Sequence, residues 1–242
     1  SDTTAVVTFS LSGSQEVPAV DTMAMGSGYA LFDTTNNNVS LVAVTTIDNA
    51  TMAHIHTGFA GVNGPVLEAL VESEETAGVW MTDGSVMLDE ATATQLLSGG
   101  HYVNVHTAAF TGGEIRGQIT PDNIEVYGIV ADGSQEVPAV TTTASGAGAF
   151  TLNTSTGALS GSVTITGMTA NMAHIHEGEA GVNGGVLLGL TDGTDGMWSV
   201  PANTTLTSEQ MDVMADGGLY TNFHSDAFPS GEIRGQITLG FD

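Results

Sequence analysis

The chain has 242 residues, of which 27 are acidic and only two are basic, so its formal net charge at pH 7 is −25. Such a surface does not displace the counterions of DNA or RNA and is repelled by anionic lipids, so we expect no nucleic-acid partner. Its field attracts cations instead. No apolar run reaches the roughly 20 residues of a membrane-spanning helix, which predicts no membrane insertion. Cysteine is absent, which excludes disulfides and thiolate metal sites.

The sequence begins with Ser-Asp-Thr-Thr, without the charged and apolar regions of a signal peptide. It has no lysine and is rich in glycine, threonine and alanine, as extracellular proteins often are. We therefore expect a mature chain, secreted, periplasmic or on the cell surface after removal of a signal peptide.

Short strands separated by turns dominate the first part of the chain. Residues 7–11 alternate between apolar and polar side chains, residues 28–32 do so more weakly, and residues 39–44 form a further apolar-rich stretch. Three asparagines at 36–38 predict a turn before that stretch. This spacing, without a long helical stripe, predicts an all-β fold, an antiparallel β-sandwich.

The next element carries the sequence His-Ile-His at residues 54–56. Successive residues of a strand point to opposite faces, so His54 and His56 lie side by side on one face. Ile55 points the other way, into the predicted core. Met52 shares the face of the two imidazoles.

A short helix is expected at residues 89–98, and its counterpart at 207–216 has Thr207 as N-cap, Gln210 three residues later, and glycines after its end. Each helix leads directly into a strand that ends in a histidine, His106 in the first case. His101, which faces away from His106, is interpreted as a solvent-facing or packing residue.

The chain's two cations, Arg116 and Arg234, occupy the same motif, Gly-Glu-Ile-Arg-Gly-Gln-Ile-Thr. Because the planar guanidinium can join two strands through a carboxylate, we expect both arginines to be partly buried in an ion pair. The first candidates for the carboxylates are Glu16 and Glu136, and the alternatives are Glu114 and Glu232.

The arginine motif is one part of a long internal repeat. Residues 12–20 return at 132–140 and residues 52–56 at 172–176, both displaced by 120 residues, whereas the later motifs are displaced by 118. The slip of two residues must fall between the Asn-Gly turn and the tryptophan of each copy. A period of this length has the size of a whole domain, so we predict two tandem domains, 1–120 and 124–242.

Six of the seven histidines pair across this repeat. They are His54, His56 and His106 in the first copy, and His174, His176 and His224 in the second. If the strand of the third histidine lies near His-Ile-His, three imidazoles converge on a site suited to copper, with zinc as the alternative. The other interpretation is structural, with histidines that hydrogen-bond turns.

Two further patterns bear on metal binding. Met52 and Met172 keep their place beside the histidines, and a thioether ligand there would favour copper, especially Cu(I). Residues 191–196, Thr-Asp-Gly-Thr-Asp-Gly, are interpreted as an exposed turn, with a calcium site as the alternative. The first copy has no aligned version of this turn and has Glu72, Glu74 and Glu75 nearby instead.

Four motifs in a fixed order resemble the CHRD domain, a module named for its repeats in the morphogen antagonist chordin and found in secreted bacterial proteins. They are Gln-Glu-Val-Pro, Ala-His-Ile-His, Tyr-Val-Asn-Val-His and Gly-Glu-Ile-Arg-Gly-Gln-Ile. The resemblance covers both copies almost end to end. It implies an immunoglobulin-like or related β-sandwich and an extracytoplasmic location.

The His-x-His pattern with a later strand histidine is also similar to the copper site of copper/zinc superoxide dismutases, which are β-sandwiches too. The chain departs from those enzymes by lacking disulfide cysteines and a zinc loop. A surface at −25 would moreover repel superoxide.

Three functions are compatible with these patterns. The first is an extracytoplasmic copper-binding protein, with one three-histidine site per domain, for sequestration or delivery. The second is a copper-dependent oxidoreductase of the superoxide dismutase type, and the third is a metal-free adhesion or matrix module. We expect the first, with the metal ion as partner and no catalytic residue assigned. The oligomeric state and an extracellular protein partner stay open.

Overall fold

The computed structural model describes residues 3–241. The chain divides into two compact units, Ser1–Ile124 and Glu125–Asp242, each with its own hydrophobic core. The division falls at the beginning of strand β11 (Ile124–Asp132).

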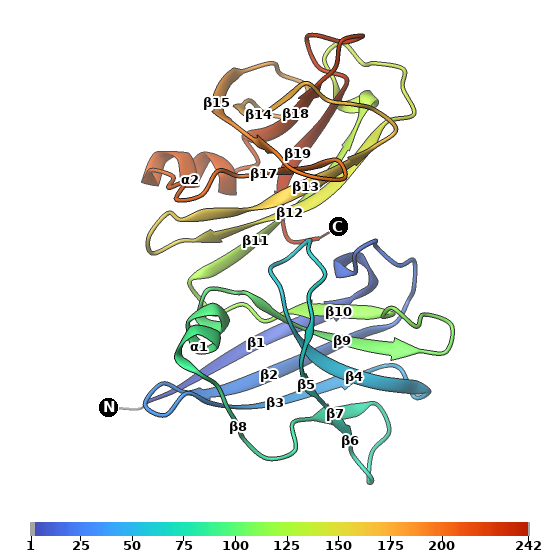
Figure 1. Cartoon of the computed structure of the whole chain (residues 1–242), viewed down its shortest axis with the longest axis vertical. Coiled ribbons are helices and arrows are strands. Elements are labelled where there is room, and N and C mark those ends of the chain that lie inside the picture. Colours follow the sequence, from blue (N-terminus) through green and yellow to red (C-terminus); the bar gives the residue numbers. More distant parts are fainter. Residues whose placement is uncertain (1–2, 242) are drawn as a thin grey trace. The chain divides into compact units, whose positions relative to one another are not determined.

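The described part of the first unit forms one antiparallel sheet of ten strands. The strands are β1 (Thr4–Ser12), β2 (Met25–Asp33), β3 (Asn38–Thr45), β4 (Ala50–Thr57), β5 (Val66–Ala69), β6 (Val71–Glu72), β7 (Val79–Met81), β8 (Val86–Met87), β9 (His101–Thr107) and β10 (Ile115–Gln118). Their order is β5-β4-β9-β10-β1-β2-β3-β7-β6, and β8 pairs with β3 (Figure 1).

The described part of the second unit repeats this order in nine strands. They are β11, β12 (Ser145–Asn153), β13 (Leu159–Thr166), β14 (Met172–Glu177), β15 (Gly185–Gly189), β16 (Thr191–Asp192), β17 (Met197–Ser199), β18 (Leu219–His224) and β19 (Ile233–Leu239). Their order is β15-β14-β18-β19-β11-β12-β13-β17-β16.

Each sheet curls into a nearly closed sandwich or barrel around its core. The two edge strands of the first sheet, β5 and β6, are consecutive in the chain and joined by Leu70 alone, whose side chain is buried. Leu190 joins β15 and β16 in the same way. The predicted all-β fold of two tandem antiparallel domains is therefore confirmed.

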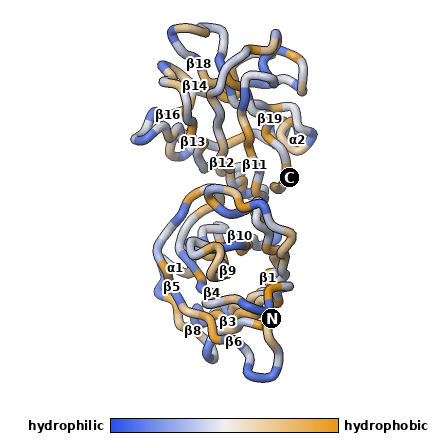
Figure 2. Tube along the Cα trace, turned by 90° about the vertical axis from the view of Figure 1, so that its right-hand side faces the viewer, coloured by the Kyte–Doolittle hydropathy of each residue, from blue (hydrophilic) through white to orange (hydrophobic). Residues whose placement is uncertain are grey.

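The core side of the sheets contains the residues that the alternation predicted. Val7, Leu11 and Leu41 are buried in the first core, and Ile55 points into it from β4. The most hydrophilic stretches in Figure 2 lie in turns, for example beside β16. The repeat's slip of two residues falls in the connection from β6 to β7, which has six residues (73–78), against four (193–196) from β16 to β17.

The two predicted helices are present. Helix α1 (Glu90–Leu97) begins after Asp89, whose side chain accepts a hydrogen bond from the Thr92 amide, and helix α2 (Ser208–Ala215) begins with a capping box of Thr207 and Gln210. Leu96 of α1 and Met214 of α2 occupy corresponding positions, and each side chain is buried in the core of its own unit. Among the described residues, no helix is long and apolar enough to cross a membrane.

Candidate metal centre

The three histidines of the first unit meet on the face of the sheet that points away from the core. His54 and His56 lie on β4, and His106 lies on the neighbouring antiparallel strand β9. One ring nitrogen of each imidazole lies within 4.8 Å of those of the other two. The second unit brings together His174, His176 and His224 from β14 and β18 with the same limit on distance.

Backbone carbonyls fix the tautomers of two of the three imidazoles. Nδ1 of His56 lies 2.9 Å from the carbonyl oxygen of Gly64, and Nδ1 of His106 lies 2.9 Å from that of Thr111. A carbonyl oxygen only accepts hydrogen bonds, so both Nδ1 atoms carry the proton and both Nε2 atoms are unprotonated. The corresponding distances are 3.0 Å for His176 to Gly184 and 2.9 Å for His224 to Pro229.

One unprotonated nitrogen in each unit has no hydrogen-bond partner. Nε2 of His56 is buried without a hydrogen-bond partner, and so is Nε2 of His176 in the second unit. A buried nitrogen without a partner is costly unless something binds to it. Such an orphan acceptor at the meeting point of three imidazoles fits a metal ion.

His54 faces the other two imidazoles through Nδ1 and not through Nε2. Its Nδ1 lies 3.2 Å from Nε2 of His106, and the same pair in the second unit is 3.1 Å apart. Because Nε2 of His106 is the acceptor, Nδ1 of His54 holds the proton whose place a metal would take. Metal–nitrogen bonds of about 2.0–2.1 Å allow ligand atoms to be at most about 4.2 Å apart, so only small side-chain movements close the site.

Burial lowers the pKa of four of the six histidines in the two groups. Burial lowers the pKa of His54, and the nearby His106 lowers it further. Burial also lowers the pKa of His56, His174 and His224. Neutral imidazole is the form that binds metals, so the lowered pKa values of these four histidines favour the metal-binding form.

A layered stack of side chains holds the second histidine of each group. The ring of Tyr102 lies parallel to that of His56, with centroids 4.8 Å apart and an interplanar angle of 4°. The guanidinium of Arg116 lies 3.4 Å from the centroid of the same ring. In the second unit, His176 is stacked on Tyr220 at 5.0 Å and 11°, and Arg234 lies 3.5 Å from that ring.

The predicted carboxylate pairing of the arginines is wrong. Arg116 is 1% exposed, and its hydrogen bonds go to neutral oxygens, the Phe59 carbonyl at 3.0 Å, the Gln118 side chain at 3.1 Å and Asn63 at 3.4 Å. Glu16 acts on it only through its charge. The alternatives, Glu114 and Glu232, hydrogen-bond threonine and serine hydroxyls instead. Arg234 makes the same three kinds of contact as Arg116. It donates to the backbone carbonyl of Glu179 and to the side-chain oxygens of Gln236 and Asn183.

Glu16 is bound by Asn104 rather than by the arginine. The Asn104 side-chain amide donates to its Oε1 at 2.7 Å, and Asn222 does the same to Glu136 at 2.8 Å. Burial raises the pKa of both carboxyls to about 7, against the lowering effects of the arginine's charge and of this hydrogen bond. The Gln-Glu-Val-Pro motif is thereby joined to the strand that carries the third histidine.

The Ala-Gly-Val-Asn-Gly turn positions the carbonyl that holds His56. Asn63 donates to the Val17 carbonyl at 2.6 Å, and the amide of Gly64 donates to the Tyr102 hydroxyl at 3.1 Å. A Cβ on Gly64 would collide with the backbone oxygen of Thr57. Only glycine therefore allows this close approach.

Tyr102 and Asn104 were missed as site residues in the sequence, and so were their equivalents Tyr220 and Asn222. The signal was available, because in Tyr-Val-Asn-Val-His the tyrosine and asparagine share the face of the histidine at a period of two. Gly64 and Glu16, by contrast, lie outside the strands and carry no periodic signal.

The remaining predicted positions lie outside the three-histidine groups. His101 is fully buried, so it is a packing residue and not solvent-facing, and its burial lowers its pKa to about 4. Met52 lies opposite His106, and Met172 opposite His224, in the strand register. Asp192 and Asp195 are exposed, and the turn at 191–196 is not among the groups of potential ligands found in the described residues.

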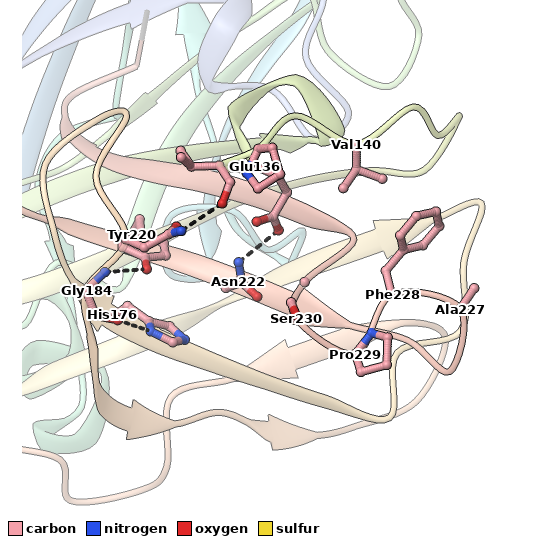
Figure 3. Close-up of a pocket in the computed structure, with 14 residues that line it drawn as sticks. Glu136, Val140, His176, Gly184, Tyr220, Asn222, Ala227, Phe228, Pro229 and Ser230 are labelled. Carbon is pink, nitrogen blue, oxygen red and sulfur yellow. Dashed lines mark hydrogen bonds between the residues drawn. The ribbon is translucent and has the colours of Figure 1, made fainter.

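A groove of about 400 Å³ in the second unit is lined by one of its three grouped histidines, His176. Its polar lining includes His176, Asn222 and Glu136, and its apolar lining includes Val140 and Phe228 (Figure 3). The groove thus runs from His176, past the buried carboxyl, to an apolar end.

The family model described as the CHRD domain matches the chain twice, at residues 7–119 and 127–237. Each match spans nearly one whole unit and includes its three histidines. No curated protein matches the chain.

Proposed function

The chain belongs to the CHRD domain family, and we propose that it is an extracytoplasmic copper-binding protein with one three-histidine site per domain, for sequestration or delivery of the ion. Three of its features support the proposal. Two of the three imidazoles in each unit are oriented by backbone carbonyls, the same arrangement occurs in both units, and the net charge of −25 attracts cations.

One observation carries the proposal: the buried, unpartnered Nε2 of His56 and of His176 at the meeting point of the imidazoles. Water-exposed histidines that only hydrogen-bond turns would not need this arrangement in both units. Imidazole is a ligand of copper and zinc alike, and copper generally binds nitrogen sites more tightly than zinc does.

Titration calorimetry with copper tests the sites directly. The unaltered chain should bind two ions, and replacement of both His56 and His176 by alanine should abolish tight binding while the melting temperature stays near that of the unaltered chain. A matched control replaces Asp192 and Asp195 by asparagine in the acidic turn, which should leave copper binding unchanged. Loss of binding in the control alone would move the site to that turn.

Metal analysis of protein purified without an affinity tag tests which ion is loaded. We expect copper in a ratio approaching two per chain. Zinc at that ratio would replace copper in the proposal, and metal-free protein that also fails to bind copper would leave the adhesion or matrix function.

A copper-dependent oxidoreductase is the second candidate, and the groove beside His176 favours it. The groove could admit a small molecule, and three protein ligands leave a coordination position for it. A saturable turnover of superoxide that disappears in the histidine double variant would establish this activity. Stoichiometric binding without turnover would leave sequestration or delivery.

A further inference from the structure

We infer that Met52 and Met172 are thioether ligands that complete the two sites and make them select monovalent copper. The inference deepens the proposed metal-binding function and rests on it. It concerns side chains that the three-histidine groups do not include.

The strand register places each methionine beside two of the three imidazoles. Met52 precedes His54 by two residues on β4 and therefore shares its face. It also lies directly opposite His106 on β9. Opposed residues of antiparallel strands have Cβ atoms about 4.5–5.5 Å apart, which the methionine side chain spans easily. Met172 has the same two neighbours, His174 and His224.

The methionine side of the site is the open side. On the opposite side, His56 is covered by the Tyr102 ring, and His106 is tied to the Thr111 carbonyl. Met52 is 47% exposed and Met172 is 46% exposed, so these flexible side chains are free to turn toward an ion. The pairing of β4 with β9 shifts register between Ala50 and Met52, so regular pairing ends at Met52.

The donor set then decides which ion is preferred. Three imidazoles alone suit copper and zinc, whereas a soft thioether favours Cu(I) over harder divalent ions. With the methionine, the site offers four ligands, three nitrogens and one sulfur. Removal of the sulfur should therefore affect monovalent copper much more than zinc.

The test compares Cu(I) and Zn(II) affinities of the full chain with and without the two thioethers. Replacement of both Met52 and Met172 by leucine keeps size and hydrophobicity, and both positions are exposed enough that the fold should persist. We expect Cu(I) affinity, measured anaerobically against a chromophoric Cu(I) chelator, to fall at least tenfold. Zn(II) affinity should change by less than about threefold, because a thioether is a poor zinc ligand.

The chain supplies a matched control in two other exposed methionines of the first unit, Met23 and Met87. Their replacement by leucine should leave both affinities unchanged. Unchanged Cu(I) affinity in the Met52 and Met172 variant would overturn the inference, and so would an equal loss of both metals, which would indicate a structural role. An unaltered chain that binds neither metal would instead refute the proposed function itself.

A second readout locates the sulfur without any substitution. With methionine methyl groups labelled for NMR, addition of Ag(I), a redox-inert monovalent ion, should shift the signals of Met52 and Met172 and not those of Met23 and Met87. Shifts confined to the histidine rings would count against thioether ligation.

Discussion

At the scale of single residues, the arrangement of the three histidines depends on the side chains that contact them. Tyr102 contacts His56 through its ring and Gly64 through its hydroxyl, and Gly64 in turn accepts from His56. The imidazole is therefore fixed on its face and at its Nδ1. Such supporting partners of a metal ligand commonly contribute 10–100-fold to metal affinity.

Substitution of the tyrosines separates the ring from the hydroxyl. Replacement of Tyr102 and Tyr220 by phenylalanine keeps the stacked ring and should lower copper affinity less than about threefold. Replacement by leucine removes the flat ring and should lower it about tenfold, or about 1.4 kcal/mol. Calorimetry measures both, with circular dichroism as the check on folding. Equal affinities in the two variants would show that the stack does not position His56.

His101 should make the first unit sensitive to acid. Its buried imidazole has a pKa of about 4, below the value near 6.5 of an exposed histidine, so the unfolded chain binds the proton first. The stability that depends on neutral His101 is therefore complete above about pH 6.5 and is lost as the pH falls toward 4, by up to about 3 kcal/mol.

The second unit has no titratable group at the equivalent position, because Leu219 is buried there. We expect His101→Leu to leave the first unit with a smaller loss of unfolding free energy between pH 7 and pH 4.5 than the unaltered chain. Denaturant unfolding at the two pH values measures this. An identical loss in both proteins would assign the acid sensitivity to other groups.

At the scale of elements, the turn at 60–64 connects the repeated motifs to the ligands. Gly64→Ala should push the turn away from Thr57 and remove the carbonyl partner of His56. We expect a loss of about 1–3 kcal/mol in unfolding free energy, the usual range for overpacking, together with weaker copper binding. Gly112→Ala is the matched control, since a Cβ there meets nothing within 4 Å. Equal effects of the two substitutions would contradict this role of the turn.

The elements themselves were largely predictable from sequence, and their pairing was not. Alternation and turns predict strands such as β1 and β3, and the Thr207 capping box predicts the start of α2. The two strands of the site are separated in sequence by α1 and four short strands, so nothing local indicates that β4 and β9 are neighbours. The internal repeat nevertheless indicated which histidines form each group, because the same three histidines recur in both copies.

The arginines show where sequence reasoning failed. A lone cation in an acidic chain suggests a carboxylate partner, yet Arg116 lies against an aromatic ring and carbonyl oxygens. Burial explains this, because the guanidinium's planar face can stack on Tyr102 while its edge donates to Phe59 and Gln118. The identity of such partners depends on the packing of distant loops, which no local pattern encodes.

At the scale of the whole molecule, the charge distinguishes the candidate functions. A net charge of −25 surrounds both sites with a field that draws in cations and repels anions such as superoxide. Salt screens this field, since the Debye length falls from about 30 Å at 0.01 M to about 8 Å at 0.15 M. Higher salt should therefore slow the association of cations with the protein and speed the association of anions.

We expect the rate of copper uptake, measured by stopped-flow quenching of tryptophan fluorescence, to fall severalfold over this range of salt. The cause is the loss of long-range attraction, so the dissociation rate should change much less. Any turnover of superoxide should instead become faster, because screening removes the repulsion of an anionic substrate. Sodium chloride and sodium nitrate at equal ionic strength control for chloride binding to copper. Uptake that is independent of salt would mean that the acidic surface serves solubility alone and does not help to collect the ion.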